Sequence, residues 1–546
     1  TGMPFPSQSA PSGASLVSHS GSTWSGLVGN RRSIGFDYAI SAGQELVTGV
    51  ADYVDFLLDQ PSTKVVACVI ETLREPARFL QALEKADRKG IPIVVLKLGR
   101  SEIGQKFAIS HSGAISGSAA VYEAVLRKHN VIQVRSLDEL MDTVELFARS
   151  PRLALPSLAL GTDSGGERQL IVDIATDIGL DFAPLEAATT VRVQALLDTG
   201  MEAANPLDYW GDGADVMAPT LSAMAEDAGV GMVVMAANMP GGRAFMHQCA
   251  DAIISVKNGT SKPVALLGNV SSTIAPEGAA RVRDAGIPVL MGTEPGLRAI
   301  KHFIDYSRRL PIEVETTSSS EKSAQTRGAA LGDRTPGSLS SAEGFGLLGK
   351  RTIPVTPYAM IENVADIDAF VAANGYPVVL KIDDPAIPHK SDAGGVHINL
   401  RSREDVEAAM TRLKALHPDA PVMVQKQAAG RELILGMTTD PDFGPVVTLG
   451  LGGIYAEVFK DVVILPVPFG TREARAALES LKSYPILAGA RGQKPVYIDK
   501  VVDAVVSFGQ LSRDVEGVIS EIEINPLLAG PDQVVAVDCL AVRTGA

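Results

Sequence analysis

The chain has 546 residues, 46% hydrophobic and 21% charged, a globular composition that excludes a largely disordered protein. Its 49 Lys and Arg against 63 Asp and Glu give a net charge of −14, which excludes general attraction to nucleic acid or anionic membranes. Three scattered cysteines, no signal pattern and no apolar run near the ~20 residues of a membrane helix exclude a disulfide framework and predict a cytoplasmic protein.

Residues 1–150 alternate short β-branched runs with amphipathic segments. We expect strands at 64–70 and 91–98, with a helix at 76–88 between them. This strand–helix–strand rhythm predicts a parallel sheet covered by helices on both faces. The first predicted domain is therefore an α/β domain over 1–150.

Two small-residue loops each follow a predicted strand and lead into a helical segment. They are residues 18–21, Ser-His-Ser-Gly, and residues 164–166, Ser-Gly-Gly. Free amides and a partial positive charge at a helix N-terminus favour anions. Such turns are also common without any ligand, and we interpret His19 as a turn residue with no functional role.

A third small-residue loop, 110–117 (SHSGAISG), precedes a helical pattern at 119–129. Small residues let the backbone approach a phosphate, so His111 could be phosphorylated and held there. A plain tight turn with a surface histidine has about equal weight on this motif alone. Glu71 ends the strand 64–70, where it could orient the ring of His111, or it could be an ordinary strand-end charge.

A second α/β domain is predicted over 151–311, with strands around Leu158, at 232–235 and at 263–267. Residues 312–341 are rich in Ser, Thr, Gly and Ala and carry almost no large apolar side chains. We predict that this segment is a flexible linker, and that 342–546 forms a separate C-terminal domain.

The C-terminal domain has an α+β pattern. Strands are expected at 376–382, 422–426 and 432–437, and helices at 366–374 and 403–416. Its pattern differs from the strand–helix alternation of the N-terminal part, which predicts a different architecture.

Several chemically capable residues lie in this domain. Lys381 lies within the strand 376–382, and His389 and Lys390 lie in a Gly-containing loop, IPHKSDAGGV. Near the end of the chain, strand alternation in EIEINPL places Glu521, Glu523 and Asn525 on one face. Oxygen atoms of Glu523, Asn525 and Asp538 could hold Mg²⁺ against ATP phosphates, although any one of them could be an ordinary strand-face polar residue.

Four motifs occur in the order SHSGAISG, HKSDAGGV, LGLGGIYAE and EIEINP. With them the chain resembles the NDP-forming acyl-CoA synthetases, relatives of succinyl-CoA synthetase, over nearly its whole length outside the linker. The resemblance implies an α/β fold with two flavodoxin-like parallel-sheet domains of the succinyl-CoA synthetase type, followed by an α+β ATP-grasp domain.

The resemblance also implies residue roles. His111 is expected to carry phosphate at the acyl-transfer site, with Glu71 orienting it, and His389 is expected to collect phosphate from ATP, with Glu523 supporting it. Lys381 is expected to contact the ATP phosphates. The other expected binding residues are Gln425, Lys426, Gln427 and Glu432 for adenosine, Asn525 and Asp538 for Mg²⁺, and Ser20, Gly21, Gly113, Gly165 and Gly166 in the loops around phosphohistidine.

The implied reaction joins a small-molecule carboxylic acid to CoA with ATP, through phosphohistidine and acyl phosphate, and releases ADP and phosphate. The acid is left open between an aromatic acid of the feruloyl type, which Trp24 and Trp210 could favour, and a short-chain acid. The family often dimerises, so a homodimer is one expectation.

One departure from the family concerns CoA. Fused members begin with a Rossmann-like CoA-binding domain, whereas here ASLVSHSG occurs at 14–21 with no GxGxxG turn before it. We expect that domain to have been removed or to reside in another chain. Two alternative functions remain: an ATP-grasp ligase without phosphohistidine, and a non-catalytic protein that binds nucleotide or acyl-CoA for regulation.

Overall fold

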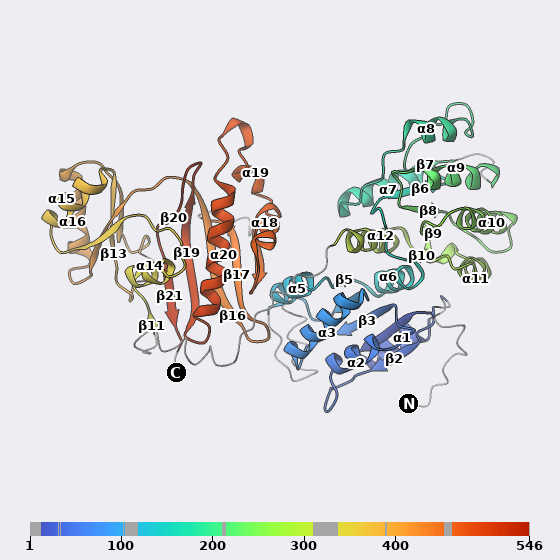
Figure 1. Cartoon of the computed structure of the whole chain (residues 1–546), viewed down its shortest axis with the longest axis horizontal. Helices are drawn as coiled ribbons and strands as arrows, with labels where there is room; N and C mark the ends of the chain where they lie inside the picture. The colour runs from blue at the N-terminus through green and yellow to red at the C-terminus, as the bar shows by residue number, and fades with distance from the viewer. Residues whose placement is uncertain are drawn as a thin grey trace. The chain divides into compact units, whose positions relative to one another are not determined.

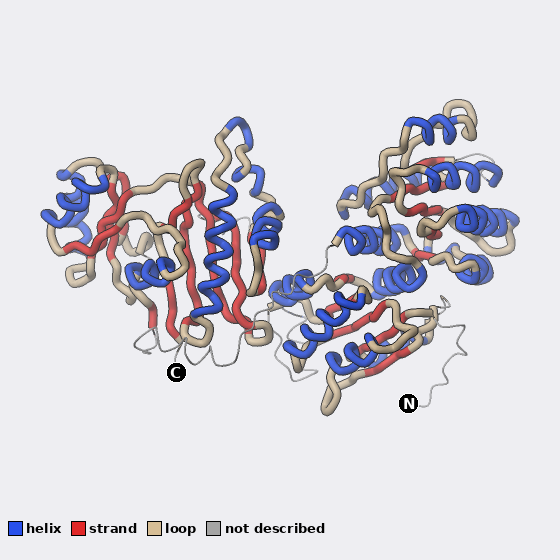
Figure 2. The backbone as a smooth tube through the Cα atoms, viewed as in Figure 1, coloured by secondary structure: helices blue, strands red, loops and turns tan. Residues whose placement is uncertain are grey.

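The computed structural model describes residues 12–30, 32, 34–101, 103, 118–209, 214–309, 337–387, 390–452 and 461–544. The chain divides into two compact units, with the main division between residues 309 and 337. Each unit is built from two β-sheets and the helices that cover them (Figure 1; Figure 2, strands in red).

The first sheet lies in the N-terminal unit and is entirely parallel, in the order β2-β1-β3-β4-β5. This is the flavodoxin-like order, in which the chain reverses direction across the sheet between β1 and β3. Its strands are β1 (Ala14–Ser18), β2 (Tyr38–Ser41), β3 (Val65–Ile70), β4 (Ile93–Lys97) and β5 (Ile132–Val134). Its helices are α1 (Gly21–Val28), α2 (Val50–Leu58), α3 (Pro76–Lys89) and α6 (Leu137–Arg149). Helix α5 (Ala119–Lys128) lies between β4 and β5 in the sequence, and its residues 120–125 belong to the second compact unit.

The second sheet repeats this topology in the order β10-β9-β8-β6-β7, again with parallel pairing throughout. Its strands are β6 (Leu158–Thr162), β7 (Leu207–Asp208), β8 (Met232–Ala236), β9 (Val264–Gly268) and β10 (Val289–Met291). Its helices are α7 (Gly165–Ile178), α8 (Ala187–Gln194), α9 (Ala214–Glu226), α10 (Ala244–Gly259), α11 (Pro276–Asp284) and α12 (Thr293–Arg308).

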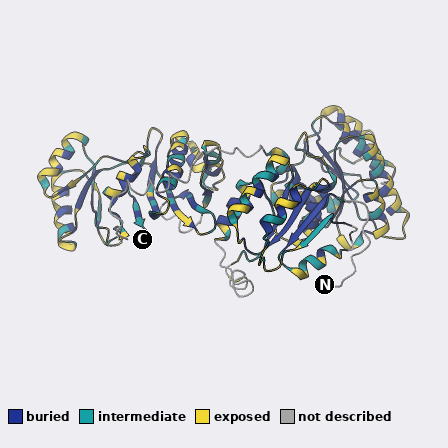
Figure 3. Ribbon diagram, turned by 60° about the horizontal axis from the view of Figure 1, so that its bottom comes forward, coloured by how far each residue is buried: buried dark blue, intermediate teal, exposed yellow. Residues whose placement is uncertain are grey.

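Helices α6 and α12 pack against each other, and one apolar core extends from the first sheet through them to the second. The central strands are buried along their whole length, because helices cover both faces of each sheet (Figure 3, dark blue). The predicted pair of parallel α/β sheets is therefore confirmed.

The C-terminal unit contains two sheets whose named strands pair antiparallel. The larger has the order β11-β21-β19-β16-β17-β18, with β20 on β19, and the smaller has the order β12-β15-β13-β14. The strands are β11 (Gly337–Ser338), β12 (Tyr358–Ile361), β13 (Val378–Ile382), β14 (Val396–Leu400), β15 (Val422–Lys426), β16 (Arg431–Asp440), β17 (Gly444–Leu451), β18 (Val462–Pro466), β19 (Ile519–Ala529), β20 (Val534–Ala536) and β21 (Leu540–Arg543).

The helices of this unit are α14 (Ser341–Gly349), α15 (Val364–Asn374), α16 (Arg403–Leu416), α18 (Thr471–Glu479), α19 (Tyr484–Leu487) and α20 (Ile498–Asp514). Helix α20 packs on β17 of the larger sheet, and α16 packs on β13 of the smaller one. The α+β expectation for this part of the chain is confirmed.

The predicted linker, 312–341, lies largely outside the described residues, but its last part belongs to the C-terminal fold. Strand β11 pairs with β21, and Ser340 caps α14 by accepting a hydrogen bond from the Glu343 N–H at 3.2 Å. The C-terminal fold thus includes residues from Gly337, earlier than the predicted start at 342. Composition misleads here because serine is typical both of linkers and of helix N-caps.

Within the described ranges, no helix is both long and apolar enough to cross a membrane.

Candidate active site

The first candidate site lies where the chain reverses across the first sheet, between β1 and β3. Ligands of open α/β sheets bind at this point, outside the carboxyl ends of the strands. Strand β1 ends at Ser18, and the Ser20 side chain caps α1 by accepting from the Thr23 N–H at 3.3 Å. Glu71 directly follows β3. The structure therefore brings the predicted loop 18–21 and Glu71 to one edge of the sheet.

His19 joins these two elements. The ring nitrogen Nδ1 of His19 accepts a hydrogen bond from the Glu71 N–H at 3.1 Å. The backbone N–H of His19 donates to the Val69 carbonyl at 3.0 Å. Because Nδ1 accepts, the ring proton belongs on Nε2, which lies 3.2 Å from Glu45 Oε1. The His19 side chain is only 6% exposed. The His19 ring therefore does more than occupy a turn, because it ties the loop at 18–21 to the backbone of Glu71.

The backbone of Glu71 is held from both sides. His19 accepts from its N–H, and the buried Lys97 ammonium at the end of β4 donates to its carbonyl at 2.6 Å. Lys97 also donates to the Leu98 carbonyl at 2.6 Å. These contacts fix where Glu71 leaves the sheet, and so restrict where its carboxylate can reach.

A cavity of about 70 Å³ opens at this edge. His19, Glu45 and Glu71 line it, together with Gly43, Gln44, Thr72 and Arg74. Glu45 has a φ of 51°, a left-handed conformation that is strained for a residue with a side chain, and its carboxylate accepts from the Val50 N–H at the start of α2. Sequence reasoning missed Glu45, since no local motif marks it. His111 and Gly113 lie outside the described residues.

The second small-residue loop also caps a helix. Ser164 accepts from the Glu167 N–H at 3.4 Å at the start of α7. The Glu167 carboxylate accepts from Asn238 Nδ2 and Asn269 Nδ2, each at 2.6 Å, from the ends of β8 and β9. A β-carbon added at Gly165 would lie 2.9 Å from Asp208 Oδ2. A side chain at this position would therefore require the Asp208 carboxylate to move.

Carboxylates surround this second helix N-terminus. Burial raises the pKa of Asp163 to about 6, and the charges of Glu167 and Asp208 add to the effect. Three acidic side chains therefore weaken the attraction that the amides of α7 would exert on an anion. The predicted residues Gly165 and Gly166 are placed at a helix N-terminus, in an acidic setting.

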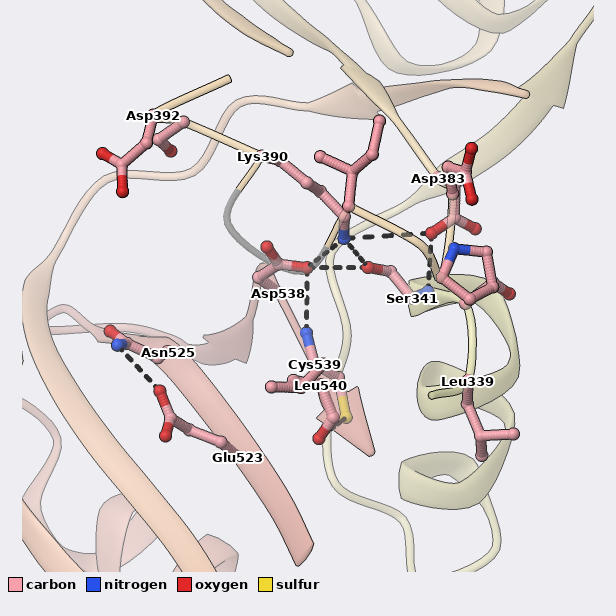
Figure 4. A pocket seen from close by; sticks show the side chains of 15 residues that line it. Leu339, Ser341, Asp383, Lys390, Asp392, Glu523, Asn525, Asp538, Cys539 and Leu540 are labelled. Carbon is pink, nitrogen blue, oxygen red and sulfur yellow. Dashed lines mark hydrogen bonds and ion pairs between the residues drawn. The ribbon is translucent and has the colours of Figure 1, made fainter. Parts of the chain in front are cut away.

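The C-terminal unit holds a separate, polar pocket of about 190 Å³ (Figure 4). Glu523, Asn525 and Asp538 all line it, as the sequence predicts for one site. Lys381 does not line the pocket, but its ammonium lies 3.3 Å from Asp538, which does. Its other lining residues are Leu339, Ser340, Ser341, Asp383, Asp384, Pro385, Ile387, Lys390, Ser391, Asp392, Cys539 and Leu540.

Asp538 is the centre of the polar network in this pocket. Its Oδ1 lies 3.3 Å from Lys381 Nζ and 3.3 Å from Lys390 Nζ, and it accepts from Ser341 Oγ at 2.8 Å. The Cys539 N–H donates to the same oxygen at 3.0 Å. Burial alone would raise the pKa of Asp538, but the charges of Lys381 and Lys390 and the Ser341 hydrogen bond outweigh it and hold that pKa below its usual value.

The two lysines are more deeply buried than Asp538, whose side chain is 33% exposed. Lys381 is 3% exposed and donates to the Val537 carbonyl at 2.7 Å. Burial lowers the pKa of Lys381; the charge of Lys390 adds to this shift, whereas Asp538 opposes it. The sequence identified Lys381 and Asp538 separately, but it did not predict that Lys390, Ser341 and Asp538 would meet.

The oxygen atoms of Glu523, Asn525 and Asp538 are hard donors of the kind that Mg²⁺ prefers. Asn525 Nδ2 donates to Glu523 Oε1 at 3.0 Å, which leaves Asn525 Oδ1 as its other polar atom. Among the described residues, no three His, Cys, Asp or Glu side chains form a metal cluster. The donor types therefore fit a Mg²⁺ ion, which would need further oxygens from outside the protein to complete its coordination.

The residues predicted to bind adenosine lie on β15 of the smaller sheet, on β16 of the larger sheet and in the connection between them. Lys426 donates to the Gly375 and Tyr376 carbonyls at 3.1 and 2.8 Å, and Gln427 Nε2 donates to Asn399 Oδ1 at 2.9 Å. Gln425 is buried within β15, and Glu432 lies on β16. None of these four lines the described pocket. His389 lies outside the described residues.

Comparisons with known proteins agree with this architecture. Residues 331–542 match the ATP-grasp domain family, and residues 11–147 match the succinyl-CoA ligase like flavodoxin domain family. The chain is 31% identical over 511 residues to acetate–CoA ligase (ADP-forming) I of Archaeoglobus fulgidus, covering 91% of this chain and 72% of that protein. It is 32% identical over 522 residues to a trans-feruloyl-CoA synthase of an unknown prokaryote, covering 92% and 72%.

A solved structure shares the fold. The acetyl-coenzyme A synthetase 1 of Ca. Korarchaeum cryptofilum, in complex with phosphate and ADP, superposes with a TM-score of 0.50 at 22% identity. The match covers 56% of this chain and 66% of that one.

Proposed function

The chain belongs to the family of ADP-forming acyl-CoA ligases, which are acid–thiol ligases, and on this premise we propose that it passes phosphate from ATP to the acid through two histidines. The ligase uses ATP, CoA and a small carboxylic acid. In the proposed relay, His389 attacks the γ-phosphorus of ATP and ADP leaves. The phosphate passes to His111, and the acid carboxylate attacks it to form an acyl phosphate. The CoA thiol then displaces phosphate and forms the thioester.

The nucleotide half of the relay is assigned to the pocket around Asp538. Lys381 would steady the phosphates with its buried ammonium, and Glu523 would support the phosphorylated ring of His389. Glu523, Asn525 and Asp538 would hold Mg²⁺, which neutralises charge that develops on the phosphate oxygens. The supporting observation is that these side chains, which lie far apart in the sequence, line or contact one pocket.

The acyl half is assigned to the edge of the first sheet. Glu71 would accept from one ring nitrogen of His111, which leaves the other nitrogen free to carry phosphate. The helix N-terminus at Ser20 and Gly21 would supply amides to that phosphate. One observation carries the proposal most directly: Glu71 emerges where the strand order reverses, with both of its backbone polar groups held by buried side chains.

The acid is proposed to be either an aromatic acid of the feruloyl type or a short-chain acid. Relatives of nearly equal identity are an acetate ligase and a feruloyl-CoA synthase. Trp24 packs against the apolar core of the first unit, so it gives no support to an aromatic substrate. Trp210 lies outside the described residues. A panel of acetate, 4-hydroxybutyrate and ferulate, read out as ADP release that requires both acid and CoA with the CoA-binding domain supplied, distinguishes these classes.

Phosphate mapping tests the relay itself. The full chain is incubated with ATP labelled at the γ-phosphate, and acid-labile protein phosphate is located by peptide mapping. We expect His389→Ala to abolish labelling, and His111→Ala to leave label only at His389. His247→Ala, at an exposed histidine on α10, is the matched control and should label normally. Unchanged labelling in both His111→Ala and His389→Ala would refute the relay and favour a ligase without phosphohistidine.

A further inference from the structure

Two lysine ammonium groups converge on one carboxylate oxygen in the nucleotide pocket. Lys381 Nζ and Lys390 Nζ each lie 3.3 Å from Asp538 Oδ1 (Figure 4 for Lys390). The two nitrogens are therefore separated by no more than twice that distance. Both side chains are more than nine-tenths buried, so solvent screens their mutual repulsion only weakly. The shared negative charge of Asp538 is what makes this pair of cations tolerable.

The position of Lys390 is determined by the fold around it. Its ammonium donates to Ser341 Oγ, at the start of α14, and lies 3.9 Å from Asp383 Oδ1. Its backbone carbonyl accepts from the Gly395 N–H at 2.7 Å. A β-carbon at Gly395 would come within 2.6 Å of Ile382 and 3.0 Å of that carbonyl, so glycine is needed to close this turn. Lys390 is thus held in the pocket by its main chain and by its side chain.

The charges that line the pocket make a second cation necessary for a polyphosphate. Five acidic residues line it, whereas Lys390 is the one basic residue among its described lining residues. A triphosphate would add further negative charge to this acidic surface. Mg²⁺ and Lys381 would offset part of that charge, and Lys390 is the remaining buried cation within reach of the same carboxylate. The acidic lining residues are Asp383, Asp384, Asp392, Glu523 and Asp538.

We propose that Lys390 is a second phosphate-binding residue of the nucleotide site, and that Asp538 occupies the place of a phosphate oxygen until the nucleotide binds. On binding, the ammonium groups of Lys381 and Lys390 exchange Asp538 for oxygens of the terminal phosphates. Asp538 then turns its carboxylate toward the cation that accompanies the nucleotide. This inference rests on the proposed function for its ligand, because it assumes that ATP occupies this pocket.

The test compares nucleotides that differ in phosphate number. Affinities of the full chain for ATP, ADP and AMP are measured by calorimetry with Mg²⁺ present, for the wild type and for Lys390→Met, Lys390→Arg and Lys414→Met. Lys414, on α16, donates to backbone carbonyls and serves as the matched control. Loss of a charged hydrogen bond predicts a ~10- to 100-fold loss of ATP affinity in Lys390→Met, with AMP affinity unchanged. Lys390→Arg should keep most of the ATP affinity.

The ratio of ATP to AMP affinity within each variant does not depend on how much of the sample is folded. A wild-type ratio in Lys390→Met would overturn the inference, whether both affinities are unchanged or both fall by the same factor. Wild-type protein that binds no ATP would instead refute the proposed nucleotide site itself. If Lys390→Met does not fold, the ratio in Lys390→Gln decides in its place, since glutamine keeps a donor for Ser341 and removes the charge.

Discussion

His19 accepts a hydrogen bond through Nδ1 from the backbone N–H of Glu71, at 3.1 Å and across 52 residues of sequence. The two residues follow β1 and β3, the strands between which the chain reverses across the first sheet. The contact therefore couples the loop that caps α1 to the carboxylate proposed to orient His111. His19 touches no reacting atom in this scheme, so its role is that of a positioning residue.

Replacing His19 with alanine should slow phosphorylation at His111 by about tenfold, because the Glu71 N–H loses its acceptor and Glu71 loses a fixed position. His19→Gln, which keeps an acceptor oxygen, should recover much of the rate. Labelled phosphate at His111 and at His389 is followed separately in time. Only the His111 signal should slow, since the nucleotide pocket lies in the other unit. Equal rates in His19→Ala and wild type, or a matching loss at His389, would contradict this role.

The stability of the chain should depend on pH through Asp163. Burial, with the charges of Glu167 and Asp208, raises the pKa of Asp163 to about 6, whereas an unfolded Asp has a pKa of about 3.9. Between these values the folded chain binds more protons than the unfolded one, so this residue makes stability fall as pH rises from about 4 to about 6. Above about pH 6 the stability contributed by protonated Asp163 is fully lost.

Asp163→Asn should therefore melt a few degrees higher than wild type at pH 7, with the difference shrinking toward pH 4. Melting temperatures measured at half-unit pH steps give this difference directly. Asp173→Asn, at an exposed carboxylate on α7, supplies the control. A difference that stays constant across the window would show that Asp163 does not titrate in it.

Local pattern was sufficient to predict individual elements. The predicted helix 403–416 and strand 422–426 agree to the residue with α16 and β15. Helix α16 begins at a capping box, in which Ser402 accepts from the Asp405 N–H and Asp405 accepts from the Ser402 N–H. Such boundaries depend on residues a few positions apart, and the sequence displays them directly.

Contacts between distant residues could not be predicted in this way. Ser341 donates to Asp538 across 197 residues, and His19 meets Glu71 only because of the strand order of the sheet. Strand order is a property of the whole sheet, and no local spacing encodes it. Family resemblance supplied Glu71 and Asp538, but it gave no reason to expect His19, Glu45 or Ser341 beside them.

The two parallel sheets of the first unit should be coupled through Arg283 and Glu145. Arg283, on α11, donates to Glu145 of α6 at 2.6 and 2.9 Å, and both side chains are almost fully buried. Glu145 also accepts from the Val289 N–H of the edge strand β10 at 2.9 Å. Arg283→Met should cost ~3–5 kcal/mol of stability, because it removes the hydrogen-bonded guanidinium from a buried carboxylate and leaves it the more distant Arg149, at 3.9 Å.

Chemical denaturation of the N-terminal unit, followed by hydrogen exchange at β10, measures this cost. The double variant Glu145→Leu/Arg283→Met should recover part of the loss, since it removes both charges. Arg281 lies on the same helix as Arg283 and forms an exposed ion pair with Asp251 of α10, so Arg281→Met should cost far less. Equal costs for Arg283→Met and Arg281→Met would show that the buried pair contributes nothing special.

Asp538 should account for much of the Mg²⁺ dependence of nucleotide binding. In the free pocket its carboxylate balances two buried ammonium groups, and in the proposed complex it turns to the metal. Asp538→Asn removes both roles, so it should lower the melting temperature without nucleotide and reduce the gain in ATP affinity that Mg²⁺ provides by about tenfold.

ATP titrations with Mg²⁺ and with EDTA measure that gain. Asp392→Asn, at an exposed carboxylate of the same pocket, should keep the full gain. A wild-type gain in Asp538→Asn would place the metal on other oxygens and leave Asp538 as a structural partner of the two lysines.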